Sequence, residues 1–264
     1  MKVMESLLGF FYPNKCILCQ KILNTKYEGQ YICSRCEEKF YSETKTLKHL
    51  YRHNTDKQVI NCRYTQMGEI KSNQTDKEQQ GINDFCYIEQ DEEQTDNPSE
   101  IIALFPYEAE YRKAILRWKY RGIRKYARGF AELLSNEINF SAYEQAVFIP
   151  IPLAPSRKRK RGYNQALDLA KALGLLTQTP VVDCLVRHKD TRPQSQCTRE
   201  ERQHNIKNTM SIKKYICDEP KSILLIDDIY TTGSTIREAI RIINEQYAFR
   251  NAKIYVIVIG KGEL

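Results

Sequence analysis

The sequence has no apolar run long enough to cross a lipid bilayer. Its long apolar runs, such as Ile254–Ile259, fall far short of the roughly 20 residues that a membrane-spanning helix needs. The N-terminal segment MKVMESLLGFFYPNKC has one early lysine and a short apolar stretch, but it also contains Glu5 and no small-residue cleavage site. These features argue against a signal peptide. We therefore expect no transmembrane segment and a cytoplasmic location.

Two common nucleotide-binding motifs are also missing. The sequence contains neither a GxxxxGK(S/T) phosphate loop nor a GxGxxG dinucleotide turn. A nucleotide-driven helicase needs the first motif, and a Rossmann-type dinucleotide site needs the second. Both classes are therefore excluded, and no internal repeat is found.

The bulk composition is that of an ordinary folded protein. The 264 residues are 41% hydrophobic and 28% charged, which is typical of a soluble globular chain. This length holds one sizeable domain and a small accessory one. The nine cysteines, if the compartment is reducing, are better explained as thiols or metal ligands than as disulfides.

Charge is unevenly distributed along the chain. Residues 1–100 carry 13 Lys and Arg against 16 Asp and Glu, a net charge of −3, and residues 101–264 carry 28 against 17, a net charge of +11. This asymmetry favours a polyanionic partner for the C-terminal part, either a phosphorylated small molecule or a nucleic acid. A solvated basic surface explains the charge alone equally well.

The composition divides the chain into three regions. Residues 1–42 are rich in cysteine and aromatics. Residues 43–100 are polar and acidic and contain DEEQTDNPSE, which predicts a linker or insertion that is partly disordered. Residues 101–264 alternate between apolar strands and amphipathic helices, which predicts an α/β domain with a parallel sheet flanked by helices. We expect strands at 101–107, 146–152, 181–187, 209–216, 222–226 and 253–259, and helices at 108–119, 126–138, 163–173 and 234–246.

Four cysteines in the first region form two closely spaced pairs. The pattern is CxxC-x13-CxxC, and its members are Cys16, Cys19, Cys33 and Cys36. Two such pairs allow four thiolates to converge tetrahedrally on one Zn²⁺, which leaves no open coordination position for catalysis. We predict a structural zinc-binding module. The alternative is a small hydrophobic hairpin with four buried thiols.

A second set of metal ligands is conceivable in this region. Cys33 and Cys36 with His49 and His53 fit the spacing of a C₂H₂ finger. That arrangement would leave the first cysteine pair unused, so the four-cysteine site is the better interpretation. Cys62 and Cys86 stand singly in the polar region, and whether they bind metal stays open.

An acidic pair stands at the end of a predicted buried strand. Asp227 and Asp228 follow Ile223–Ile226 and should lie at the carboxyl edge of a parallel sheet, where ligands bind in open α/β folds. The next turn leads into a helix whose first N–H groups suit a phosphate. The carboxylates suit two neighbouring ribose hydroxyls, so the stretch predicts a 5-phosphorylated sugar site. An ordinary N-capped helix is the simpler alternative. The residues assigned to the phosphate are Thr231, Thr232, Gly233, Ser234 and Thr235.

A basic stretch follows another predicted strand. Arg157–Arg161 are five consecutive cations in what we expect to be a turn, where they can converge on one anion. The alternative is a self-repelling exposed run. Further on, the charged segment 187–205 lacks periodicity and is either an active-site lid or a solvated loop.

The acidic segment resembles the phosphoribosyl pyrophosphate (PRPP) loop of type I phosphoribosyltransferases. The resemblance implies that the two acids hold the ribose hydroxyls, that the loop holds the 5-phosphate, and that Mg²⁺ accompanies the PRPP. It also implies a PRPP-binding role for Arg157, Arg161 and Arg202 and a catalytic role for Asp227, Asp228 and Arg161, the last stabilising the departing pyrophosphate.

The whole pattern resembles the ComF family, which joins a cysteine zinc module to a domain of type I phosphoribosyltransferase fold. Residues 43–100 depart from that pattern, because other members carry further paired cysteines there. The shared motifs are the two CxxC pairs, Leu116-Arg-x-Lys119-Tyr-Arg121-Gly122, Pro150-x-Pro152, Arg161-Gly-x-Asn164-Gln165, Thr191-x-x-Gln194, Arg202-x-x-Asn205 and the Asp-Asp loop.

The resemblance implies a role in DNA uptake during natural transformation, with a competence helicase as a partner. Two hypotheses follow. The chain binds PRPP with Mg²⁺ and transfers a phosphoribosyl group to an unknown acceptor, or it is a non-catalytic single-stranded DNA-binding module that reuses the sugar-phosphate pocket. For the second, basic residues of 112–128 interleaved with Trp118, Tyr120 and Tyr126 offer backbone charge and stacking surfaces. Packing between helices explains Trp118 and Tyr120 equally well.

Overall fold

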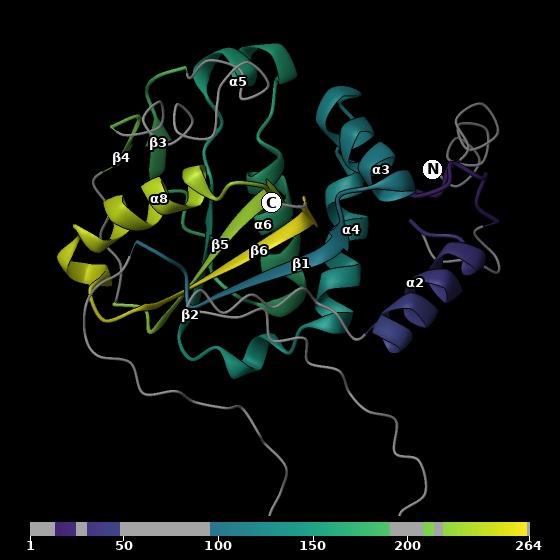
Figure 1. Ribbon diagram of the computed structural model, residues 1–264, viewed down its shortest axis with the longest axis horizontal. Helices are drawn as coiled ribbons and strands as arrows, with labels where there is room; N and C mark the ends of the chain where they lie inside the picture. The colour runs from purple at the N-terminus through teal and green to yellow at the C-terminus, as the bar shows by residue number, and fades with distance from the viewer. Residues whose placement is uncertain (1–13, 25–30, 48–95, 191–207, 214–218, 263–264) are drawn as a thin grey trace, which may run out of the picture.

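A computed structural model of the chain describes residues 14–24, 31–47, 96–190, 208–213 and 219–262 (Figure 1). Its centre is a sheet of four parallel strands in the order β1-β6-β5-β2. Ile226 of β5 pairs with Ile257 of β6 on one side and with Pro150 of β2 on the other. The strands are β1 (Glu100–Pro106), β2 (Ala146–Pro150), β5 (Ser222–Tyr230) and β6 (Lys253–Lys261).

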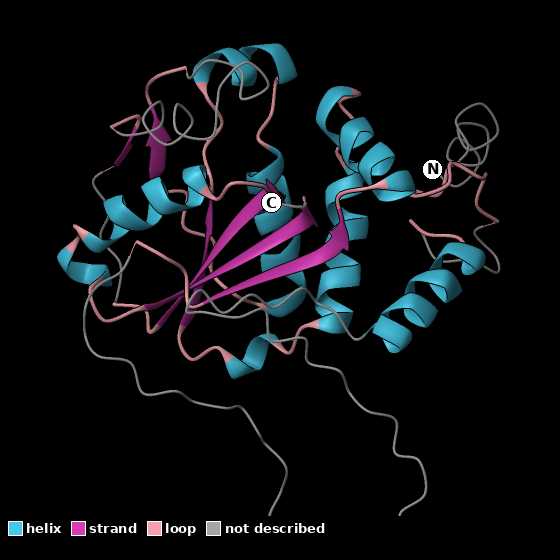
Figure 2. Ribbon diagram, viewed as in Figure 1, coloured by secondary structure: helices cyan, strands magenta, loops and turns pink. Residues whose placement is uncertain are grey.

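Helices cover both faces of this sheet (Figure 2). Alternate residues of a strand point to opposite faces, and both sets are apolar here. Leu224 and Ile226 pack in one core cluster with three helices, whereas Ile223 and Leu225 pack in a second cluster with α8. The three helices are α3 (Ala109–Tyr120), α4 (Lys125–Glu137) and α6 (Gln165–Thr177), and α8 spans Ser234–Asn244. The predicted α/β class with a parallel sheet between helices is confirmed, and the arrangement is consistent with a type I phosphoribosyltransferase fold.

Two predicted strands differ from the expectation of one parallel sheet. In the described parts of these segments, 181–187 and 209–213, the strands are β3 (Leu185–Arg187) and β4 (Met210–Ile212), which pair antiparallel as a separate sheet; residues 214–216 lie outside the described residues. Val181 makes a single parallel bridge to Phe148 of β2. The apolar runs were therefore too short to build central strands, and Leu185 and Met210 instead pack in the α8 cluster.

The basic stretch is a short helix and not the expected turn. α5 spans Pro155–Arg161. Proline at the first helical position is preorganised for a helix, and Gly162 ends it with a φ of +77°, a backbone conformation that glycine adopts at no steric cost. Pro155 and Gly162 are therefore the residues that mark this helix in the sequence. The basic run between them contains no apolar residue that could show a helical period.

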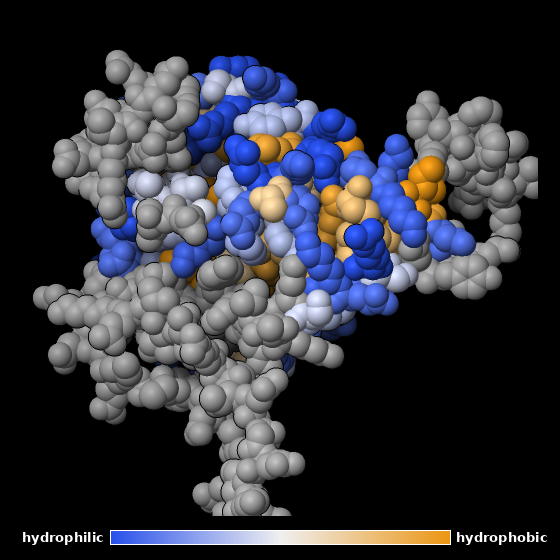
Figure 3. All heavy atoms as spheres, turned by 45° about the vertical axis from the view of Figure 1, so that its right-hand side comes forward, coloured by the Kyte–Doolittle hydropathy of each residue, from blue (hydrophilic) through white to orange (hydrophobic). Residues whose placement is uncertain are grey.

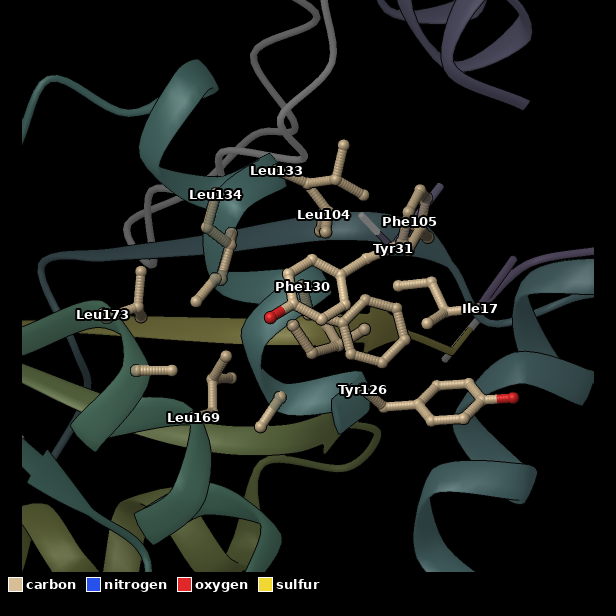
Figure 4. Close-up of a cluster of buried hydrophobic side chains, with 14 of the residues drawn as sticks. Ile17, Tyr31, Leu104, Phe105, Tyr126, Phe130, Leu133, Leu134, Leu169 and Leu173 are labelled. Carbon is tan, nitrogen blue, oxygen red and sulfur yellow. The ribbon is translucent and has the colours of Figure 1, made fainter. Parts of the chain in front are cut away.

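The cysteine module packs directly on the α/β domain. Its helix α2 spans Ser34–Leu47. Ile17 and Tyr31 of the module are buried in the same cluster as Phe105 and Phe130 (Figure 4). Gly129 of α4 makes this close approach possible, because a Cβ there would lie 2.7 Å from Ile17 Cδ1 and 2.8 Å from Tyr31 Cβ.

Most of the predicted linker, residues 48–95, lies outside the described residues, so the division at residues 42 and 100 stays a prediction. On the face shown in Figure 3, hydrophilic side chains cover much of the described surface. None of the described helices is both long enough and apolar enough to cross a membrane.

Candidate functional site

A cleft of about 800 Å³ opens at the carboxyl end of the sheet. In Figure 1 the arrowheads of β5 and β6 point toward the region between α5 and α3. The cleft is bounded by the ends of β2 and β5, the start of α8, the helix α5 and the last turn of α3. Its polar lining residues include Lys119, Tyr120, Arg157, Lys160, Arg161, Arg187, Asp227, Asp228, Thr231, Thr232, Ser234 and Thr235.

The two acids lie within β5 and not after it, because β5 continues to Tyr230 alongside β6. The carboxylate of Asp228 contacts two cations, with Lys119 Nζ 2.8 Å from its Oδ1 and Arg161 Nη1 3.8 Å from its Oδ2. Asp227 Oδ1 accepts a hydrogen bond of 2.8 Å from the backbone N–H of Asp228. The adjacent acids therefore differ in environment.

That difference appears in the ionisation of Asp227. Burial, together with the negative charge of neighbouring Asp228, raises the pKa of Asp227 to about 7. Lys119 and Arg187 lower the pKa of this carboxyl, but by less. One acid of the pair is thus poised to hold a proton near neutral pH, which lets it donate as well as accept a hydrogen bond.

The hydroxyl loop leads into α8 as expected. Gly233 has a φ of +71° and is the N-cap of α8, which begins at Ser234. The hydroxyls of Thr232 and Ser234 lie 2.9 Å apart, and Arg237 Nη2 donates a hydrogen bond of 2.8 Å to the carbonyl of Thr232. The first N–H groups of a helix have no intrahelical acceptor. Together with these hydroxyls they can bind a phosphate.

Cationic side chains form the opposite wall of the cleft. Arg157, Lys160 and Arg161 come from α5, and Arg187 comes from β3. Arg161 is oriented by a hydrogen bond of 3.0 Å from its Nη1 to Gln165 Oε1, and its guanidinium lies 5.0 Å from the ring centre of Tyr120. Burial lowers the pKa of Arg187, and the charge of Arg157 lowers it further.

The structure thus brings nearly all of the predicted site residues into one cleft. Arg202 is the exception, since it lies outside the described residues together with most of the predicted lid, residues 191–207. The PRPP-binding residues predicted from the sequence did not include Lys119, Tyr120 or Lys160. Lys160 was counted only within the basic stretch 157–161, and Tyr120 only as a stacking surface for single-stranded DNA. Lys119 and Tyr120 stand in a quoted family motif, which is the signal that pointed to them.

The predicted stacking surface on α3 and α4 is wrong for two of its three aromatics. Trp118 is 0% exposed and Tyr126 is 1% exposed, whereas Tyr120 is 61% exposed. Trp118 packs edge-on against Phe130 at 5.3 Å between ring centres. The alternative of helix packing, named for Trp118 and Tyr120, is therefore right for Trp118 and wrong for Tyr120, and Tyr126 is buried as well.

The four cysteines are brought together outside the cleft. The Sγ atoms of Cys16, Cys19, Cys33 and Cys36 all lie within 4.8 Å of one another. Cys19 Sγ and Cys33 Sγ are 3.6 Å apart, close to the ~3.8 Å between ligands that a tetrahedral Zn–S distance of about 2.3 Å requires. The group is thus close enough to hold a metal ion. His49, His53, Cys62 and Cys86 lie outside the described residues.

Arg117 ties this cluster to the cleft. Its Nη2 donates hydrogen bonds of 3.1 and 2.6 Å to the carbonyls of Ile17 and Leu18, which lie between the first two cysteines. Its Nε donates to Tyr126 Oη at 3.0 Å. Because Arg117 lies in the last turn of α3, only two residues before Lys119, the cysteine module and the cleft share one turn of helix.

Comparison with known proteins adds to this geometry. The chain is 34% identical over 161 residues to competence protein ComFC of Streptococcus pneumoniae, which covers 59% of this chain and 66% of the relative. It is 27% identical over 146 residues to ComFC of Bacillus subtilis, covering 54% and 58%. It is 33% identical over 99 residues to competence protein F of Haemophilus influenzae, covering 37% and 43%. The chain belongs to the ComF family.

No protein-family model matches this ComF-family chain. The chain spans less than two thirds of the length of the curated relatives that it matches.

Proposed function

We propose that this ComF-family protein binds PRPP with Mg²⁺ in the cleft and takes part in DNA uptake during natural transformation. The observation that carries the proposal is the meeting, in one cleft, of an acid pair, a hydroxyl-lined helix start and a basic helix. A sugar with a phosphate at one end and a pyrophosphate at the other needs these three kinds of group in this order.

Each part of the cleft has a distinct task in this proposal. The carboxylates of Asp227 and Asp228 accept hydrogen bonds from the ribose hydroxyls. The hydroxyls and N–H groups of Thr231–Thr235 bind the 5-phosphate. Arg157 and Arg161 bind the pyrophosphate and stabilise its charge if it departs. Bound Mg²⁺ would neutralise part of the phosphate charge.

The cysteine cluster fits a structural Zn²⁺. Burial raises the pKa of Cys33 and of Cys36, and the charge of Cys16 raises that of Cys36 further. Four thiolates can therefore coexist only beside a cation, and a closed set of four sulfur ligands leaves no position for chemistry. We assign the ion a role in holding the module together.

Calorimetric titration of PRPP with Mg²⁺ tests the cleft assignment. Wild type should bind, and an Asp227→Asn/Asp228→Asn variant should lose at least tenfold in affinity, because neutral amide oxygens accept the ribose hydroxyls more weakly than carboxylates do. The matched control is Asp183→Asn, which removes a half-exposed acid paired with Lys213 at 3.8 Å. Wild type that binds no PRPP would sink the proposal.

The role in DNA uptake rests on the names of the relatives, two ComFC proteins and a competence protein F. Deleting the gene from its source bacterium should reduce transformation frequency. Re-expression should restore it, and the double asparagine variant should not. Capture of a competence helicase by the wild-type chain, on the cytoplasmic side, is the corresponding test for a partner. Transformation unchanged by the deletion would contradict this role.

Binding of single-stranded DNA is a second candidate, favoured by the continuation of basic charge beyond the cleft. Lys158 and Arg159 on α5 are exposed and do not line the cleft. Lys158→Gln/Arg159→Gln should weaken binding to a labelled oligonucleotide and flatten its salt dependence, while leaving PRPP affinity unchanged. A wild-type affinity that does not fall with salt would contradict this second function.

A further inference from the structure

We propose that Lys119 is a ligand-binding residue of the cleft. In the free protein its ammonium group pairs with Asp228, and when the ligand binds, the side chain moves so that the ammonium pairs with the pyrophosphate. This inference rests on the proposed PRPP function. It names the residue whose positive charge has an anionic partner both in the free cleft and in the bound one.

The first observation is that both oxygens of Asp228 face cations. Lys119 contacts one oxygen at 2.8 Å and Arg161 approaches the other at 3.8 Å. The side chains of Lys119, Asp228 and Arg161 are only 13%, 12% and 8% exposed. Charges withdrawn from water to this extent are stable only when they are paired.

The second observation is a conflict between that pairing and the assigned role of Asp228. Ribose hydroxyls that donate to this carboxylate must approach the oxygens that the cations now face. Moving Lys119 aside without a new partner would strand a nearly buried ammonium, which is strongly unfavourable. A ligand that binds here must therefore bring an anionic group to replace Asp228 as the partner of Lys119.

The pyrophosphate meets that need better than the 5-phosphate. Lys119 shares Asp228 with Arg161, and Arg161 belongs to α5, the basic wall of the cleft. The hydroxyl loop for the 5-phosphate lies instead at the start of α8. An anion bound by Arg161 thus lies within reach of an ammonium that already approaches the same carboxylate.

The backbone of Lys119 is fixed, so only its side chain needs to move. Tyr163 Oη donates a hydrogen bond to the carbonyl of Trp118, and Gln165 Nε2 donates one of 3.5 Å to the carbonyl of Lys119. Arg117 holds the same turn to the cysteine module. A flexible four-carbon stem on a fixed backbone is suited to exchange one anion for another.

Two ligands that differ only in the pyrophosphate test the proposal. Lys119→Met should weaken PRPP binding at least tenfold in calorimetry with Mg²⁺. The same variant should leave the affinity for ribose 5-phosphate unchanged or tighter, because Asp228 loses its competitor. Equal loss for both ligands, or no loss for PRPP, would overturn the proposal.

Two further variants separate a charge effect from a folding effect. Lys119→Arg keeps the cation and should bind PRPP within threefold of wild type; if it binds no better than Lys119→Met, the transferable charge is not the cause. Lys113→Met replaces an exposed lysine on the same helix and should change neither affinity.

If wild type itself binds ribose 5-phosphate but not PRPP, the proposed function and the role of Lys119 both fail. If wild type binds PRPP and Lys119→Met does so equally, the role of Lys119 alone fails.

Discussion

At the scale of single residues, neighbouring acids differ because their surroundings differ. The carboxylate of Asp228 faces Lys119 and Arg161, whereas Asp227 receives a backbone N–H and is opposed by the charge of Asp228. Sequence order alone foresaw both acids at the sheet edge, because they follow a run of four apolar residues. It did not predict that the two carboxyls differ in charge environment and pKa. The cation that contacts Asp228 at 2.8 Å is Lys119, which belongs to a helix from a distant part of the chain.

Asp227→Asn is predicted to stabilise the protein, and only at neutral and alkaline pH. The folded state raises the pKa of Asp227 to about 7, above an ordinary value of about 3.9. Ionising this carboxyl therefore costs stability, a cost that is absent below pH 4 and complete above pH 7. We expect urea unfolding at pH 8 to show a gain of up to about 4 kcal/mol, from about three pKa units at ~1.4 kcal/mol each, shrinking toward zero at pH 4. Asp183→Asn should show no such trend. A gain for Asp227→Asn that is equal at both pH values would contradict the unequal pair.

At the scale of elements, the regular helices and strands were predictable and the irregular ones were not. The predicted helix 234–246 is α8 (Ser234–Asn244), because its apolar residues repeat with a helical period. β5 runs past its predicted end at residue 226 to Tyr230, because β6 extends alongside it to pair with that residue. α5 has no apolar residue to show a period, and only its proline and glycine mark its ends.

Gly129→Ala in α4 is predicted to destabilise the protein although alanine is the better helix former. In an exposed helix interior the change would gain about 1 kcal/mol. Here the new methyl group would stand 2.7 Å from Ile17 Cδ1 and 2.8 Å from Tyr31 Cβ. Ile17 can adjust at its tip, but the Cβ of Tyr31 moves only with its backbone. We expect a net loss of about 1–3 kcal/mol from overpacking, measured by thermal unfolding.

Arg128→Ala is the matched control, because this neighbouring α4 residue is exposed. It should be close to neutral. If Gly129→Ala is as stable as wild type, the cysteine module does not sit as tightly on α4 as the structure shows.

At the scale of the whole molecule, the cysteine module and the α/β domain share one hydrophobic core. The cluster that contains Cys16, Ile17 and Cys33 also contains Phe130 of α4 and Ile226 of β5. The change in composition near residue 42 predicted a separate module, and the sequence offers no period that links its buried residues to those of distant helices. What joins the two parts is tertiary packing.

Removing the proposed Zn²⁺ is therefore predicted to weaken the entire protein and not the module alone. Without a cation the thiols of Cys33 and Cys36 hold their protons, since burial raises the pKa of both. The carbonyls of Ile17 and Leu18 would then no longer be held against Arg117, and the shared core would open at one end.

Wild type should unfold in one calorimetric transition. Treatment with a strong chelator at neutral pH should lower the midpoint of that transition by about 5 °C or more, as a loss of 1–2 kcal/mol implies. The same loss should appear in a Cys16→Ser/Cys19→Ser variant, with metal content followed by elemental analysis. A main transition that stays at the wild-type temperature, with the module melting separately, would show that the shared core does not couple the two parts.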